Sequence, residues 1–196
     1  RYVEVLRQAR RADLEAWHRA EGIATAVDSV RAQTMSAWEL LIVDDGSSDD
    51  TAAVAEALAA IDSRIRLLRG DHTGVCAARN LGLAEARGDY VAFLDTDNTW
   101  RPRYLELSLK AMTADGLEFA YCGSRLTSES EVRYRGTQIS HEALLLYNHI
   151  DLNVTVVRAD LLRRVGGFDT SLRRWVDHDL AIRLSALSGP RYLPFI

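Results

Sequence analysis

The stretch DYVAFLDTDNTW, residues Asp89 to Trp100, contains an apolar run that is followed by two carboxylates, and this pattern indicates the fold class. Tyr90 to Leu94 form a short, aromatic-rich run bounded by polar residues, which is typical of a buried strand. Asp95 and Asp97 follow it closely. Because ligands of an open α/β sheet bind beyond the carboxyl ends of its strands, we expect both acids at the mouth of a crevice.

The spacing of Asp95 and Asp97 favours a metal site. Two unpaired carboxylates this close in sequence repel each other, and a hard divalent cation relieves the repulsion. Magnesium is typically held by one or two carboxylates together with substrate phosphates. The pattern therefore predicts a metal ion that holds a diphosphate. The alternative is a polar loop in which Asp95 or Asp97 caps the helix that Pro102 opens.

A second strand-like run also ends in acids. Residues 38–43 are almost entirely apolar, which indicates burial on both faces, as in a parallel sheet covered by helices. Asp44 and Asp45 follow, and carboxylates there can accept hydrogen bonds from a nucleobase N–H or a ribose hydroxyl. Ser47 or Ser48 is expected to cap the next helix. Capping does not explain the two acids.

The other patterns alternate between helix and strand. Further helices are expected at 22–33, 51–60, 75–86 and 102–113, and further strands at 65–68 and 117–121. This order predicts a mostly parallel, doubly wound α/β sheet. The second half is less regular, with a loop or hairpin at 124–136, helices at 140–147 and 159–165, and a strand at 153–157. Asp177 and Asp179 begin a last helix, whose dipole alone favours carboxylates in the first turn.

The first 21 residues are expected to form a charged helix at the edge of the domain. Val3, Leu6, Leu14 and Trp17 recur at roughly helical spacing, with arginines between them. The alternative is an amphipathic segment that contacts the inner face of a membrane. One domain is expected over residues 22–196, because no Gly/Pro/Ser-rich linker interrupts the chain.

The composition argues against nucleic-acid binding and a membrane span, and it indicates a cellular compartment. A net charge of -4 lacks the basic surplus of a nucleic-acid-binding protein. No apolar run approaches the roughly 18 residues of a membrane span. Cys76 and Cys122 lack metal-ligand spacing and are expected to be buried free thiols of a cytoplasmic protein.

Five segments in one order resemble the family 2 glycosyltransferases with the GT-A fold. The resemblance covers Gly22 to Ile196 and is carried by VDDGSSDDT at 43–51, GVCAARNLG at 74–82, FLDTD at 93–97, GGFD at 166–169 and the segment around Asp177. It implies an inverting transferase that moves a sugar from a nucleotide sugar, expected to be a UDP-sugar, to a hydroxyl of a glycan, lipid carrier or small molecule. Mg²⁺ or Mn²⁺ is the implied cofactor.

The resemblance assigns residues of the first half, 22–122, to the donor. Asp45 matches the carboxylate that binds the base, with Asp44 beside it. Arg79 matches a basic residue on the donor side of the cleft. Asp97 matches the direct metal ligand, and Asp95 matches a ligand of the ribose or the metal.

The second half, 123–196, is expected to form the acceptor side. Asp177 matches the catalytic base. Family members usually carry Glu before this Asp, where this chain has Val176, so Asp179 is the substitute candidate. A base on the face of the sugar opposite the leaving group would invert the anomeric centre without an enzyme nucleophile.

Other departures leave alternatives open. The family normally begins with a strand and a polar turn over the nucleotide, and no such pattern stands out before Gly22. Either this first strand lies outside this sequence, or residues are missing between about Glu21 and Gly22. We favour the second explanation, because a doubly wound sheet without its central first strand should not be stable. Further gaps are expected near 124–136 and after Ile196. A nucleotidyltransferase would show a Gly-rich basic phosphate loop, which the sequence lacks. A catalytically silent nucleotide- or glycan-binding module of a larger assembly is the remaining alternative.

Overall fold

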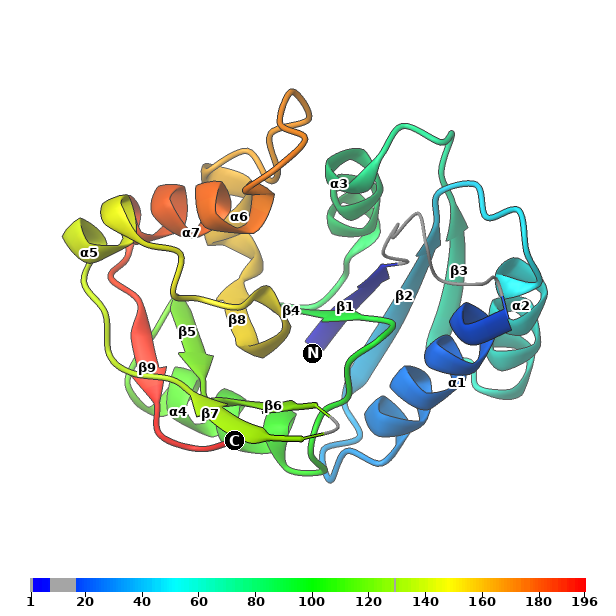
Figure 1. Cartoon of the computed structure of the whole chain (residues 1–196), viewed down its shortest axis with the longest axis horizontal. Coiled ribbons are helices and arrows are strands. Elements are labelled where there is room, and N and C mark those ends of the chain that lie inside the picture. Colours follow the sequence, from blue (N-terminus) through cyan, green and yellow to red (C-terminus); the bar gives the residue numbers. More distant parts are fainter. Residues whose placement is uncertain (1, 8–16, 129) are drawn as a thin grey trace.

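The computed structural model describes residues 2–7, 17–128 and 130–196. In this part of the chain, seven strands form one sheet in the order β3-β2-β1-β4-β8-β5-β9 (Figure 1). Their bounds are β1 Tyr2–Arg7, β2 Trp38–Asp44, β3 Ile65–Arg69, β4 Tyr90–Asp95, β5 Phe119–Cys122, β8 Thr155–Arg158 and β9 Arg191–Leu193. Only β8 runs antiparallel to its described neighbours, β4 and β5. The predicted mostly parallel α/β sheet is therefore confirmed.

Helices cover both faces of the sheet. One layer contains α1 (Trp17–Arg31), α2 (Thr51–Ile61) and α4 (Tyr104–Ala114), and the other contains α3 (Val75–Glu85), α5 (His141–Leu146), α6 (Ala159–Arg164) and α7 (Val176–Leu187). Along β2, Leu40 and Ile42 pack in the first layer, whereas Leu41 and Val43 pack in the second. Successive side chains of a strand point to opposite faces, so the apolar run of β2 serves two cores.

The prediction of a helix over residues 1–21 is wrong for Tyr2–Arg7. These residues form β1 at the centre of the sheet, where Val5 lies opposite Leu41 of β2 and Phe93 of β4. Partners on both sides come from distant segments, so local helical spacing could not reveal the pairing. Residues 8–16, including Leu14 of the predicted helix, lie outside the described residues.

The prediction that residues are missing before Gly22 is also wrong. The helix runs unbroken from Trp17 through Gly22 to Arg31, and β1 is the first strand that the sequence analysis could not find. A Cβ atom at Gly22 would lie 2.8 Å from the carbonyl oxygen of Thr96. Glycine at this position therefore lets α1 approach the loop that carries Asp95 and Asp97.

The second half contains short elements. The segment expected as a loop or hairpin forms a two-stranded ribbon of β6 (Ser124–Thr127) and β7 (Val132–Arg135). The strand expected from Asn153 begins at Thr155, because residues 152–154 form the 3₁₀ turn η1 (Leu152–Val154). The three-residue strand β9 was not predicted. Cys76 and Cys122 are buried free thiols, as expected, and burial raises the pKa of Cys122 to about 12.

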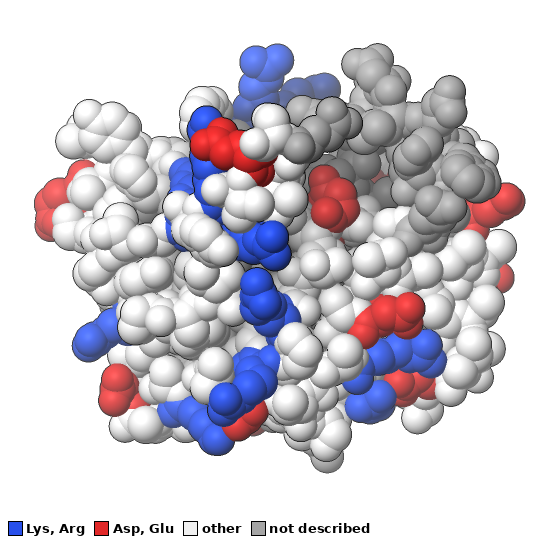
Figure 2. Space-filling view, turned by 60° about the horizontal axis from the view of Figure 1, so that its bottom comes forward, with Lys and Arg blue, Asp and Glu red and all other residues white. Residues whose placement is uncertain are grey.

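Charge is unevenly distributed over the surface. On the side shown in Figure 2, lysine and arginine side chains form a band that runs from the top to the bottom of the view, near its middle. The β6–β7 ribbon, at the bottom of Figure 1, contributes three exposed arginines, Arg125, Arg133 and Arg135. Within the described ranges, no helix is both long and apolar enough to span a bilayer.

The two-layer packing predicts a clear difference between two substitutions. Leu40 is 0% exposed, so Leu40→Ala is expected to lower the free energy of unfolding by about 2–5 kcal/mol through lost burial and a cavity. Ile61, at the end of α2, is 73% exposed, and Ile61→Ala should change it by less than about 0.5 kcal/mol. Urea denaturation measures both values, and equal losses would contradict the described packing.

Candidate active site

The sheet brings the acidic ends of two strands to one edge. β2 ends at Asp44 and β4 ends at Asp95, and both strands pair in parallel with β1 between them. The carboxyl ends of parallel strands point the same way, so Asp44, Asp45 and Asp95 lie along the same edge. The predicted position of these acids follows from the topology.

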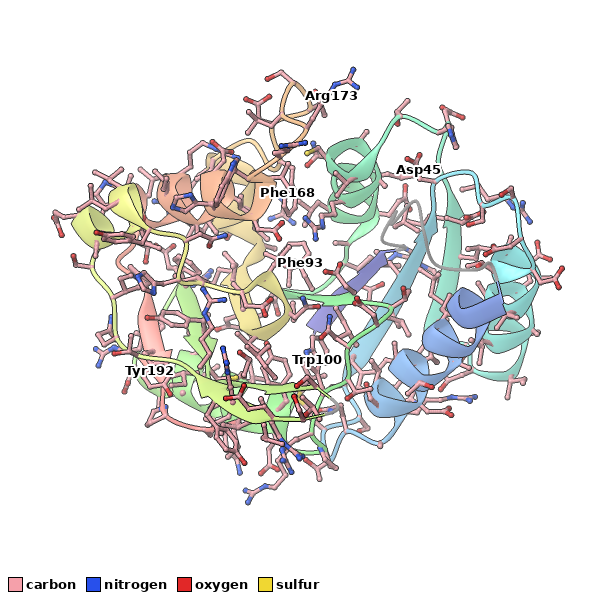
Figure 3. The ribbon with its side chains drawn as sticks, viewed as in Figure 1. Asp45, Phe93, Trp100, Phe168, Arg173 and Tyr192 are labelled. Atoms are coloured by element: carbon pink, nitrogen blue, oxygen red, sulfur yellow. The ribbon has the colours of Figure 1, made fainter. Side chains whose placement is uncertain are left out.

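A pocket of about 600 Å³ opens beside the end of β2. Its walls are the turn after β2, the segment leading into α3 and the loop after α6. Asp45 lies on the β2 side, and Arg173 projects from the loop on the other side of the gap (Figure 3). The volume is within the usual range for small-molecule sites.

Asp45 is held at the start of α3. Its Oδ1 accepts the N–H of Thr73 at 3.1 Å, and its Oδ2 accepts the N–H of Gly74 at 2.6 Å. The N-cap of this helix is Gly74, with a φ of 96° and no side-chain cap. A carboxylate has about four acceptor sites, so Asp45 can bind these amides and still accept a ligand hydrogen bond.

Asp44 has a different position from Asp45. Its side chain is buried and accepts both the N–H of Ser47, at 3.0 Å, and the hydroxyl of Ser47. Ser47 therefore closes the turn and does not cap α2, whose N-cap is Asp50. Among the described residues that line the pocket, Asp45 is present and Asp44 is not. The geometry makes Asp44 a support of the turn beneath the pocket.

Arg79 connects two further acids predicted from the sequence. Its Nη1 lies 2.5 Å from Oδ1 of Asp177, and its Nη2 lies 3.4 Å from Oδ1 of Asp95. The side chain is only 2% exposed, and its guanidinium carbon lies 5.0 Å from the centre of the Phe168 ring. The structure thus brings together residues of α3, β4 and α7 that are far apart in the chain.

Asn153 is a site residue that the sequence analysis missed. Its side chain accepts the N–H of Asp95 at 2.6 Å and donates to Oδ2 of Asp95 at 3.3 Å. The Asn153 amide also donates to Asp151 at 3.0 Å. Both carboxylate oxygens of Asp95 therefore have protein partners. A polar residue just before the β-branched run of β8 was the available signal.

Asp97 is the accessible member of the predicted metal pair. It is exposed, and Nδ2 of Asn98 donates to its Oδ1 at 2.9 Å. Neither Asp95 nor Asp97 caps α4, whose N-cap is Arg103. In the described ranges, no three His, Cys, Asp or Glu side chains are grouped to hold a metal. A single carboxylate beside a diphosphate is nonetheless a donor set that Mg²⁺ accepts.

Asp179 makes structural contacts away from Arg79. Arg183 donates to Oδ2 of Asp179 through Nε at 2.9 Å and through Nη2 at 2.6 Å. The same guanidinium donates to the carbonyls of Val165 and Gly167. Arg183 therefore joins α7 to the segment that follows α6, and Asp179 orients this arginine from within α7, whereas Asp177 faces the Arg79 cluster.

Asn80 holds the GGFD segment against α3. Its side chain donates to the carbonyl of Phe168 and accepts the Phe168 N–H, both at 2.8 Å. A Cβ atom at Gly167, where φ is 69°, would lie 2.5 Å from Oδ1 of Asn80. The Phe168 ring then packs edge-on against Phe93 of β4 at 5.5 Å. These contacts hold the Phe168 ring next to the guanidinium of Arg79.

A second pocket lies beside Asn153, the residue that contacts Asp95. Its volume is about 400 Å³, and it lies between the loop after β4 and strand β6. Asn153, which contacts Asp95, forms part of its wall, together with Arg101 and Arg125. Asp45 thus lines the first pocket, and Asn153, the partner of Asp95, lines the second.

A mostly parallel α/β sheet with acids gathered at its carboxyl edge is the arrangement of GT-A proteins. Residues 16–171 match Glycosyl transferase family 2, and the chain belongs to this family. The structure superposes on TarS of S. aureus with a TM-score of 0.76 at 15% identity, over 100% of this chain and 36% of TarS. PcManGT of Pyrobaculum calidifontis, solved with GDP-Man and Mn²⁺, gives a TM-score of 0.73 at 19% identity, over 98% and 54% of the two chains.

Two Escherichia coli proteins show the sequence relationship. UDP-Glc:alpha-D-GlcNAc-diphosphoundecaprenol beta-1,3-glucosyltransferase WfgD is 36% identical over 56% of this chain and 43% of its own length. The uncharacterized glycosyltransferase YibD is 32% identical over 55% of this chain and 31% of its own length. The chain thus aligns with less than half the length of these relatives.

Proposed function

We propose that the protein is a metal-dependent, inverting glycosyltransferase that moves a sugar from a UDP-sugar to a hydroxyl acceptor. The observation that carries this proposal is the Arg79 cluster, which brings Asp95, at the end of β4, and Asp177, on the acceptor-side half, to one cation. A pocket large enough for a nucleotide lies beside the end of β2. Membership of family 2 supports the reaction class.

The donor base is assigned to the first pocket. Asp45 lines it and has acceptor capacity left for a nucleobase N–H. Uridine is the proposed nucleoside because the name of WfgD specifies UDP-Glc and a TarS structure contains UDP. Arg173, exposed on the opposite side, can attract the anionic donor.

Asp97 is the proposed direct metal ligand. Asp95 is the proposed second acid of the site, as a ligand of the ribose or the metal. Asp95 shares its oxygens with Arg79 and Asn153, whereas Asp97 is exposed. Mg²⁺ or Mn²⁺ bound there would neutralise negative charge on the departing diphosphate. The Mn²⁺ in the PcManGT structure supports a divalent ion in this fold.

Asp177 is the proposed base. Its Oδ1 is paired with Arg79, so Oδ2 remains to take the proton of the attacking hydroxyl. Attack from the side opposite the diphosphate inverts the anomeric centre. The second pocket, next to Asn153, offers space for the acceptor, which we propose to be a glycan, a lipid carrier or a small molecule.

Calorimetric titration with UDP tests the donor site. Binding is expected in the presence of Mn²⁺ and is expected to be lost with a chelator or in Asp97→Ala, because that carboxylate would hold the ion. Asp115→Ala removes an equally exposed acid at the end of α4 and should bind UDP as the wild type does. Metal-independent binding would refute the metal assignment. UDP binding without turnover of any UDP-sugar would favour the silent-module alternative.

Two isosteric substitutions on α7 test the base. Asp177→Asn should lower the transfer rate by about 10²–10⁴-fold, because the general base is lost, and should leave the UDP dissociation constant within about threefold. Asp179→Asn should retain transfer within a few-fold and lower the melting temperature through the lost Arg183 contacts. UDP release and thermal unfolding measure these effects. Full transfer by Asp177→Asn would disprove the assignment.

A further inference from the structure

We propose that Arg79 is a positioning residue for Asp177 and not a ligand of the donor phosphates. The inference rests on the proposed function, because it concerns the base of that same reaction. It departs from the donor-side role that the family resemblance implies for this arginine.

Burial argues against a direct phosphate contact. The Arg79 side chain is 2% exposed, so little guanidinium surface is available to an incoming diphosphate. Both terminal nitrogens already face carboxylates, at 2.5 Å for Asp177 and 3.4 Å for Asp95. Arg173, by comparison, is exposed and lines the first pocket. A donor phosphate would have to displace an existing ion pair to reach Arg79.

The contact with Asp177 determines which oxygen can act. The Asp177 side chain is 35% exposed and begins α7, where it could otherwise adopt several rotamers. Pairing with Arg79 fixes Oδ1, and none of the described residues donates a hydrogen bond to Oδ2. Oδ2 is therefore the oxygen presented to the acceptor.

The proton balance is consistent with this division. As the acceptor oxygen forms its bond to the anomeric carbon and the bond to the diphosphate breaks, Oδ2 of Asp177 receives the hydroxyl proton. The diphosphate leaves with the bonding electron pair. Arg79 keeps its charge throughout, because a guanidinium is not deprotonated in proteins. Arg79 thus acts through Asp177 and exchanges no proton.

The support for Arg79 comes from α3 and the GGFD segment. The Phe168 ring lies 5.0 Å from the guanidinium carbon. Asn80, the next residue of α3, holds the backbone of Phe168 by two hydrogen bonds of 2.8 Å. The guanidinium is therefore fixed before any substrate binds, which is what a positioning group requires.

Kinetics and binding of Arg79→Gln and Arg79→Lys test the inference. We expect Arg79→Gln to lower kcat by about 10²-fold, a loss within the range of a misplaced catalytic group, with the Kd for UDP and Mn²⁺ within about threefold of the wild type. Arg79→Lys keeps the cation and should recover about tenfold in kcat. In an Asp177→Asn background, Arg79→Gln should lower kcat by less than a further threefold. Thermal unfolding checks that each variant is folded. If Arg79→Gln does not fold, the kcat and Kd of Arg79→Lys decide the test.

Arg164→Gln is the matched control, since it breaks a surface ion pair of 3.0 Å with Glu118 and should change neither kcat nor Kd. A tenfold or larger loss of UDP affinity in Arg79→Gln or Arg79→Lys, with kcat retained at saturating donor, would overturn the inference alone and make Arg79 a donor ligand. The UDP titration needs no acceptor. A wild-type protein that transfers no sugar would instead overturn the proposed function.

Discussion

A buried guanidinium needs anionic partners, and in this molecule they come from opposite halves of the chain. Arg79 lies on α3, between Asp95 at the end of β4 and Asp177 at the start of α7. Arginine is almost never fully buried unless it is paired. The packing of α3, β4 and α7 therefore has to satisfy this one charge. The same requirement brings the proposed donor side and the proposed acceptor side of the site together.

Smaller polar contacts fix the surroundings of this ion pair. Asn153, from the second half of the chain, holds Asp95, and Asn80 holds the backbone of Phe168 beneath Arg79. Asp44 closes the turn that carries Asp45, and Asp45 in turn binds the first amides of α3. Apart from the contact of Asp44 with Ser47, which lies within one turn, each contact links segments that are far apart in the chain. These contacts thus fix the turn after β2, the end of β4 and the GGFD segment around Arg79.

Much of this architecture could be predicted from local patterns. The apolar runs of β2 and β4, each followed by acids, indicated the parallel sheet and the position of the site. β1 could not be recognised in this way, because Tyr2–Arg7 contains apolar residues at spacings compatible with a helix and its partners lie far along the chain. Propensity alone does not settle such segments, since pairing overrides it.

The roles of individual polar residues were harder to predict, because they depend on which way a side chain points. Asp44 and Asp45 are adjacent in sequence, yet one supports a turn and the other lines a pocket. Asp177 and Asp179 differ in the same way, since they contact Arg79 and Arg183 respectively. The contribution of Asn153 depends on a contact with Asp95 across 58 residues, which no local pattern encodes.

We propose that one carboxylate, Asp177, activates the acceptor for a single displacement at the anomeric carbon. The most direct test is the configuration of the product, read from the coupling constant of its anomeric proton by NMR after transfer from an α-linked UDP-sugar. A single displacement gives a β-linked product. An α-linked product would require two displacements or a front-face reaction, and would contradict the role given to Asp177.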